Sequence, residues 1–173
     1  TKFLCGHSDA MGGLLAGKKE LVQKVFQFRE INGASLQADP AYMIARGMKT
    51  LQLRIERQNT SAMKIAHFLQ QHSKVKAVYF PGLESHPGHA IAKKQMRGFG
   101  GMMSFALDGG YDRVEQFLPN LKLVHLAASL GSVSTLAGPP RTTSHVELTE
   151  AQRKHLGIPE SLVRYSVGIE DVE

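Results

Sequence analysis

Short apolar runs alternate with segments of helical periodicity from residue 75 onward, and this alternation constrains the fold more than any other feature of the chain. Four runs are predicted to form strands: 75–80, 102–107, 123–130 and 163–169. Between them we predict helices at 86–97, at 111–118 and after a Thr149/Gln152 capping box. The stretch 131–144 is rich in glycine, proline, serine and threonine and predicts a long loop. Strands that alternate with helices indicate an α/β architecture.

The preceding part of the chain is predicted to be mainly helical. A buried strand at 10–16 should lead into an amphipathic helix from Lys18 to Ile31, which Gly33 ends. Asp39 and Pro40 then begin a long helix, because aspartate caps free amides and proline fits the first turn. Its apolar positions recur at spacings of three and four on both sides of a polar break at 56–59: Ile44, Met48, Leu51, Ile55, Ala62, Ile65 and Leu69. Because the break contains no glycine or proline, we predict that the helix continues through it to about residue 69.

The composition is that of a globular protein. The chain has 173 residues, 42% of them apolar and 21% charged, enough for one ordinary core or two small ones. No apolar run approaches the roughly 20 residues of a membrane span, and no signal-peptide pattern is visible. The single Cys5 cannot form an internal disulfide, which suits a reducing compartment. We therefore expect a soluble, cytoplasmic protein that does not associate with membranes.

The formal net charge of +6 raises the question of nucleic-acid binding. The basic residues are scattered, and Lys18–Lys19 and Lys93–Lys94 are the only adjacent lysine pairs. There is no tryptophan, and no aromatic residues interleave with a basic stripe as base stacking would require. We expect no nucleic-acid partner and assign the excess charge to solvated helix faces and an anionic small-molecule site.

The first eight residues, Thr1 to Ser8, contain a lysine between a hydroxyl residue and an apolar pair, followed by a Gly-His-Ser turn. A lysine so placed can hold a carbonyl cofactor as a Schiff base, because its amine has a flexible stem and loses its proton readily when desolvated. We predict that Lys2 binds pyridoxal 5'-phosphate in this way. The Thr1 hydroxyl and the amides of the turn would bind the phosphate group, and His7 would shape the loop by hydrogen bonding.

The segment Thr1–Ser8 resembles the cofactor-lysine signature of the pyridoxal-phosphate (PLP) enzymes of cysteine and methionine metabolism, the trans-sulfuration family. Five further segments are similar to the landmarks of that family, in its order: Arg46–Arg54, Tyr79–Leu83, Gly98–Met102, Ser129–Gly131 and Leu162–Glu170. The resemblance covers the whole chain. It implies the C-terminal part of a PLP-dependent transferase of the aspartate aminotransferase-like type (fold type I). Residues 1–55 would end the large PLP-binding domain, and residues 56–173 would form a smaller α/β C-terminal domain.

The resemblance also implies a PLP-dependent carbon–sulfur lyase that acts by γ-elimination on methionine or cystathionine and gives 2-oxobutanoate, ammonia and a thiol. Lys2 would be the catalytic residue, and Ser129 and Arg164 would hold the α-carboxylate of the amino acid substrate. Ser134 stands where several members carry a glutamate that contacts the distal amino group of a cystathionine-like substrate. It is therefore a candidate specificity position, and its identity leaves room for smaller γ-substituents.

Several alternatives stay open at this level. The enzyme could instead catalyse γ-replacement, as a cystathionine γ-synthase or an O-acyl-homoserine sulfhydrylase does, or the chain could be an assembly module with an unmodified Lys2. A free Thr1 can itself act as a nucleophile. Arg164 can form a structural salt bridge, and Ser129 can cap a strand. His86 and His89 could contribute to a zinc site, but a helix start fits them better, and we predict no metal.

The family resemblance implies that the residues completing the cofactor site precede the lysine and that a closing helix follows the last residue. We therefore expect an upstream segment, or a companion chain of the same enzyme, to complete a homotetramer built from dimers.

Overall fold

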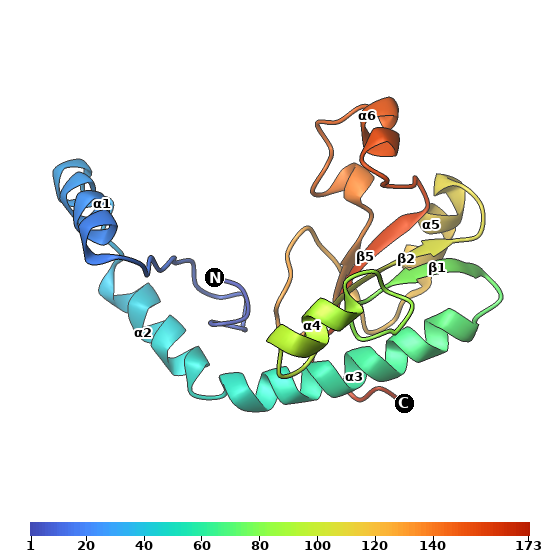
Figure 1. Ribbon diagram of the computed structural model, residues 1–173, viewed down its shortest axis with the longest axis horizontal. Helices are drawn as coiled ribbons and strands as arrows, with labels where there is room; N and C mark the ends of the chain where they lie inside the picture. The colour runs from blue at the N-terminus through green and yellow to red at the C-terminus, as the bar shows by residue number, and fades with distance from the viewer. The chain divides into compact units, whose positions relative to one another are not determined.

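The computed structural model describes residues 1–173 and divides into two compact units, Thr1–Leu51 and Gln52–Glu173 (Figure 1). The helices are α1 (Lys19–Asn32), α2 (Ala38–Met48), α3 (Leu51–Gln71), α4 (His89–Gln95), α5 (Tyr111–Phe117) and α6 (Glu150–His155), with 3-10 turns η1 (Leu118–Asn120) and η2 (Pro140–Thr142). The strands are β1 (Val75–Tyr79), β2 (Met102–Leu107), β3 (His125–Leu126), β4 (Leu136–Gly138) and β5 (Leu162–Ser166). None of the helices has the length and apolar character needed to cross a membrane.

The first unit is built from the N-terminal loop and two helices. Helix α1 ends as predicted, because Gly33 adopts a left-handed conformation (φ 66°) and its amide bonds the carbonyl of Arg29. The predicted buried strand at 10–16 is wrong, since this segment is irregular and mostly exposed. Its two glycines, Gly12 and Gly13, weaken a strand, and this unit contains no other strand with which it could pair.

The long helix predicted from Asp39 to residue 69 is in fact two helices. α2 ends at Met48, and α3 begins at Leu51. Between them the amides of Lys49 and Thr50 and the hydroxyl of Thr50 all bond the Gly47 carbonyl, at 3.3 Å for both Thr50 groups. A threonine hydroxyl that competes for a helix carbonyl favours a local break. Beyond the break, α3 runs without interruption through residues 56–59, as predicted.

The second unit is a five-stranded mixed sheet covered by helices. The strand order is β1-β2-β5-β4-β3, with antiparallel pairs except for β4 and β3, which are parallel. Figure 1 shows β1, β2 and β5 side by side, with α3 running along the sheet. Strand β5 is therefore central, between β2 and β4.

The core of this unit lies between one face of the sheet and the helices α3 and α5. Strand β5 contributes Val163, strand β2 contributes Phe105, and the inner face of α3 contributes small residues such as Ala62 and Ala66, all of which are buried. Burying a side chain such as Phe105 stabilises the fold by about 1.5–3 kcal/mol. Because side chains alternate along a strand, residue 164 lies on the opposite face of the sheet from Val163.

Most predicted strands and helices of this unit are confirmed, with several differences. The strand predicted at 163–169 ends at Ser166. The strand predicted at 123–130 is reduced to the two residues of β3, and α4 begins only at His89. The predicted loop 131–144 contains β4, whose three residues are all buried. A three-residue strand that is buried throughout gives no alternation, so periodicity cannot reveal it. The Thr149/Gln152 capping box is present as predicted.

Candidate functional site

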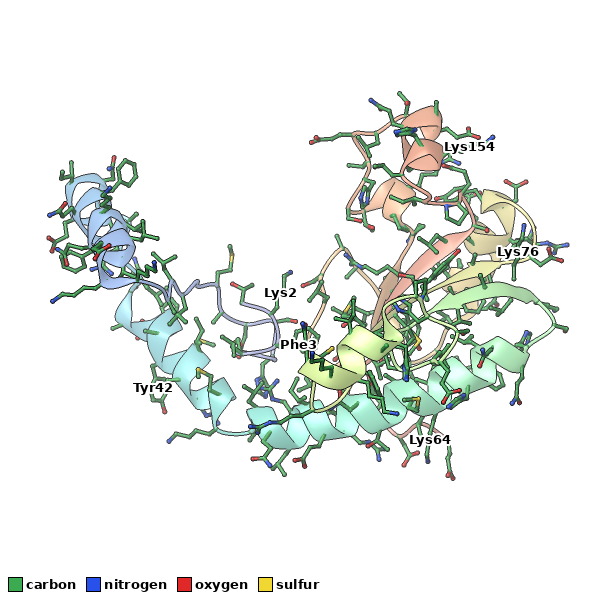
Figure 2. The ribbon with its side chains drawn as sticks, viewed as in Figure 1. Lys2, Phe3, Tyr42, Lys64, Lys76 and Lys154 are labelled. Carbon is green, nitrogen blue, oxygen red and sulfur yellow. The ribbon has the colours of Figure 1, made fainter.

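The lysine loop of the first unit is a short, tightly bonded turn. The Gly6 amide donates to the carbonyl of Lys2 at 2.8 Å, and Ser8 is the one non-glycine residue of the chain with positive φ (57°). His7 Nδ1 lies 2.8 Å from the Cys5 carbonyl oxygen, so its ring contacts its own turn, as expected. Figure 2 shows Lys2 on this loop next to Phe3, and the lysine side chain is exposed. A hydrogen-bonded loop that carries an exposed lysine fits the attachment of a carbonyl cofactor.

The hydroxyl of Thr1 is engaged by the loop itself. It donates to the Gly12 carbonyl at 3.0 Å and accepts from the Gly12 amide at 2.8 Å. A phosphate bound here would replace the Gly12 carbonyl as the acceptor. A primary amine for the carbonyl and a neighbouring hydroxyl for the phosphate are donor types that suit pyridoxal 5'-phosphate.

The loop is anchored to α2 by a close approach of two backbones. A Cβ atom at the buried Gly47 would overlap the Cys5 carbonyl oxygen and would lie 3.0 Å from its carbon. Only glycine lets the turn after Lys2 lie this close to the helix. The thiol of Cys5 is buried and lies 3.3 Å from an oxygen of Asp9. These contacts fix the turn within the first unit.

Arg164 occupies the middle of the central strand of the second unit, on the face opposite the core. Its Nη2 donates to the main-chain carbonyl of Ser129 at 2.8 Å and lies 3.4 Å from that of Ala127. Its neighbours in the register are Ser104 of β2 and Gly138 of β4. No carboxylate lies within ion-pair distance of Arg164, so the structure does not support the alternative of a structural salt bridge.

Partial burial affects the electrostatics of Arg164. Desolvation lowers the pKa of its guanidinium from the ordinary value. The side chain stays charged at neutral pH because arginine titrates far above it. A partly desolvated cation held by carbonyl groups and lacking a carboxylate partner is a good receptor for a carboxylate, which it can bind with two parallel hydrogen bonds.

The structure joins two of the three predicted site residues of this second unit, Ser129 and Arg164. Ser129 accepts from Arg164, and Ser134 lies further along the same segment, half-buried, with its amide donating to the Ser132 hydroxyl at 3.3 Å. Lys2 and Thr1 belong to the first unit. The predicted roles of all five residues remain proposals, to which we return below.

Sequence reasoning missed two polar residues that organise this region. Gln58 is completely buried in α3 and donates to the Ser132 carbonyl at 3.0 Å. Its neighbour Asn59 accepts from the Gly100 amide at 2.7 Å. Both belong to the polar break at 56–59 in an otherwise apolar stripe, and that break was the available signal. Polar side chains inside a packed helix face need partners, and loops provide one for each of these residues, although the buried Oε1 atom of Gln58 has none.

The histidines predicted to start a helix are engaged locally. His86 Nδ1 accepts from the Gly88 amide at 3.0 Å, and His89 Nδ1 lies 2.8 Å from the Pro81 carbonyl. The His89 ring stacks on Phe99 with centroids 5.3 Å apart. No cluster of three histidine, cysteine or acidic side chains has the geometry to hold a metal.

Three lysines of the second unit lie on separate elements. Figure 2 labels Lys64 on α3, Lys76 on β1 and Lys154 on α6. Binding to a phosphate backbone depends on lysines and arginines clustered on one face or along one helix. These three lysines belong to three different elements.

A mainly apolar cavity of about 810 Å³ lies on the core side of the sheet in the second unit. Its lining includes Phe105, Phe117 and Ser61, and the buried Ser61 hydroxyl has no hydrogen-bond partner. Arg164 and Ser129 do not line it, so it is separate from the candidate carboxylate site.

Comparison with solved structures identifies the class of fold. The structure of cystathionine γ-synthase from Xanthomonas oryzae pv. oryzae in complex with aminoacrylate and cysteine matches 99% of this chain with a TM-score of 0.93 and 40% sequence identity. The chain covers 44% of that protein. The fold is therefore the C-terminal part of an α/β PLP-dependent transferase of fold type I, as predicted.

Comparison of sequences identifies the family. The profile of the family described as "Cys/Met metabolism PLP-dependent enzyme" matches residues 1–173. The L-methionine γ-lyase of Fusobacterium nucleatum subsp. polymorphum is 46% identical over the whole chain, and the chloroplastic cystathionine γ-synthase 1 of Nicotiana tabacum is 43% identical. The chain belongs to the family of PLP-dependent enzymes of cysteine and methionine metabolism. It spans 44% and 32% of the lengths of these two relatives, so it corresponds to less than half of each.

Proposed function

We propose that the enzyme containing this chain is a PLP-dependent carbon–sulfur lyase that removes a thiol from the γ-carbon of methionine or cystathionine. The observation that carries this proposal is that Arg164, on the central strand of the second unit, donates to the Ser129 carbonyl and has no carboxylate partner. Within the first unit, the exposed Lys2 on a hydrogen-bonded turn also supports it. Relatives that are methionine γ-lyases support the choice of reaction.

Lys2 would act as the attachment point of the cofactor and as the base at the substrate α-carbon. When bound, pyridoxal 5'-phosphate supplies an electron sink that stabilises a carbanion next to the reacting carbon. Elimination from the γ-carbon requires the loss of a proton from Cα and then of one from Cβ. The flexible four-carbon stem of Lys2 lets one amine reach both positions, and Thr1 would hold the phosphate.

Arg164 would bind the substrate α-carboxylate, and the Ser129 region would complete that contact. The guanidinium is already partly desolvated and is oriented by the Ser129 carbonyl, so little rearrangement is needed when a carboxylate arrives. Residue 134 would lie toward the distal end of the substrate. Its short side chain suits methionine at least as well as cystathionine.

γ-Replacement is a second candidate, because cystathionine γ-synthases are found among the close relatives and among the matching structures. Synthases and lyases of this family share the early proton transfers and differ in whether a thiol or water completes the reaction. The residues of the present chain serve both reactions equally.

The remainder of the enzyme is part of the proposal. An upstream segment or companion chain would supply the rest of the cofactor site, residues 1–55 would end the large domain, and residues 56–173 would form the C-terminal domain. Assembly into a homotetramer of dimers and a cytoplasmic location are proposed with it.

A substrate assay of the holoenzyme tests the reaction. We expect release of α-keto acid and thiol from methionine or cystathionine without an added acceptor thiol. Turnover of O-acylhomoserine only when a thiol is supplied would instead identify γ-replacement. Absence of turnover with every one of these substrates, in a holoenzyme that contains bound cofactor, would contradict both.

A further inference from the structure

Glu170 forms a pair of strong hydrogen bonds that none of the proposed steps uses. One oxygen of its carboxylate accepts from the Thr135 amide at 2.6 Å, and the other accepts from the Thr135 hydroxyl at 2.8 Å. Thr135 is buried. Hydrogen bonds to an ionised carboxylate are short and about twice as strong as neutral ones, so this pair joins the residues after β5 firmly to the segment before β4.

The backbone next to Glu170 strengthens the same connection. The Ile169 amide donates to the Val133 carbonyl at 2.8 Å, and the Gly168 amide donates to the Thr135 hydroxyl at 2.9 Å. A Cβ atom at Gly168 would overlap the Val133 carbonyl oxygen. The chain therefore needs glycine at this position to bring the two segments into contact.

Further hydrogen bonds hold the other end of the loop 131–135. The Gly131 amide donates to the Ser166 hydroxyl at 2.8 Å, and Gln58 donates to the Ser132 carbonyl. Ser129, two residues before Gly131, accepts from Arg164. The loop is thus tied to β5 at one end, beside the proposed carboxylate receptor, and to the residues after β5 at the other end, through the Glu170–Thr135 pair.

We propose that Glu170 is a positioning residue for the recognition of the substrate carboxylate. Its bonds to Thr135 hold the loop 131–135, and the loop sets the place of the Ser129 carbonyl that orients Arg164. The same bonds fix residue 134, the neighbour of Thr135, at the candidate specificity position. This inference rests on the proposed role of Arg164.

The test compares two ligands of the holoenzyme that differ only in the α-carboxylate: methionine and its decarboxylated analogue 3-(methylthio)propylamine. Loss of a hydrogen bond to a charged group should weaken methionine binding by about tenfold in Glu170→Gln while leaving the binding of the amine within about twofold. The variant should raise KM for methionine more than it lowers kcat. Asp171→Asn is the matched control, since this neighbouring carboxylate is exposed and contacts Arg57 at 3.8 Å, with no bond to the loop.

Variants of the partner residue keep the test decisive if Glu170→Gln does not fold. Thr135→Val removes the hydroxyl and should reproduce the loss of carboxylate preference, whereas Thr135→Ser keeps the hydroxyl and should retain it. Equal effects of Glu170→Gln and Thr135→Val on both ligands, or no effect of either variant on any ligand, would overturn the proposal.

Arg164→Gln separates the positioning role of Glu170 from the role of Arg164 as the carboxylate receptor. If it removes the preference for the carboxylated ligand while Glu170→Gln and Thr135→Val do not, only the positioning role fails. If Arg164→Gln leaves that preference intact, the proposed carboxylate receptor itself is wrong.

Discussion

Replacement of Gly47 by alanine tests whether the lysine loop depends on its contact with α2. An added Cβ atom would overlap the Cys5 carbonyl oxygen and lie 3.1 Å from the Cys5 Cα atom. Both neighbours are backbone atoms, so no side-chain rotation relieves the contact. The carbonyl that His7 also contacts would have to move.

The expected change in stability of Gly47→Ala follows from two opposing effects. Alanine is favoured over glycine in a helix by about 1 kcal/mol. Forced overpacking of a tight site costs about 1–3 kcal/mol. We therefore expect a net destabilisation of roughly 1 kcal/mol, together with displacement of the turn that follows Lys2 and faster loss of the cofactor.

The assay is urea unfolding of the holoenzyme, with cofactor release followed by absorbance. Gly13→Ala is the matched control in the same unit, because a Cβ atom there meets nothing within 4 Å. It should leave both measurements nearly unchanged. If Gly47→Ala is instead more stable, as helix propensity alone predicts, and keeps its cofactor as well as the parent does, the anchoring argument is refuted.

Three further predictions concern the second unit. Ser134→Glu should improve the use of cystathionine relative to methionine, measured as the ratio of kcat/KM values; an unchanged ratio removes residue 134 from the specificity argument. Burial and the nearby charge of Glu170 raise the pKa of Tyr165 to about 12. The neutral phenol therefore contributes stability that is complete below about pH 10 and is lost as the pH rises toward 12. Tyr165→Phe should therefore flatten the fall of the urea midpoint in this window, and an identical fall would contradict this. Thr149→Ala removes the capping box of α6 and should cost about 1 kcal/mol, seen as a lower urea midpoint; no change would show that the cap is dispensable.

The sequence predicted the elements with strong periodicity or clear end signals. β2 and α5 match their apolar patterns, Gly33 ends α1, and the capping box begins α6. These signals are local, because they depend on residues within one or two turns of the chain.

The failures of prediction have non-local causes. The segment 10–16 is apolar enough for a strand but has no partner strand in its unit. β4 exists because β5 and β3 lie on either side of it, which three buried residues cannot signal. The end of α2 depends on how Thr50 competes for a carbonyl.

The sequence motifs predicted the candidate functional residues. They did not predict the hydrogen bonds that support those residues. Lys2 and Arg164 stand out in their local sequences, and the structure shows Arg164 bonded to Ser129. The contributions of Gln58 and Glu170 come from residues 74 and 35 positions away from their partners. Pairing over such distances is set by the fold and has no signature in either segment alone.

The proposed function depends most directly on the bond between Lys2 and the cofactor. Borohydride reduction of the holoenzyme, followed by proteolysis and mass spectrometry, should place a single phosphopyridoxyl group on the peptide that contains Lys2, and Lys2→Ala should abolish the adduct. An unmodified Lys2 in a preparation that retains bound cofactor, or an adduct on a different lysine, would contradict the central claim.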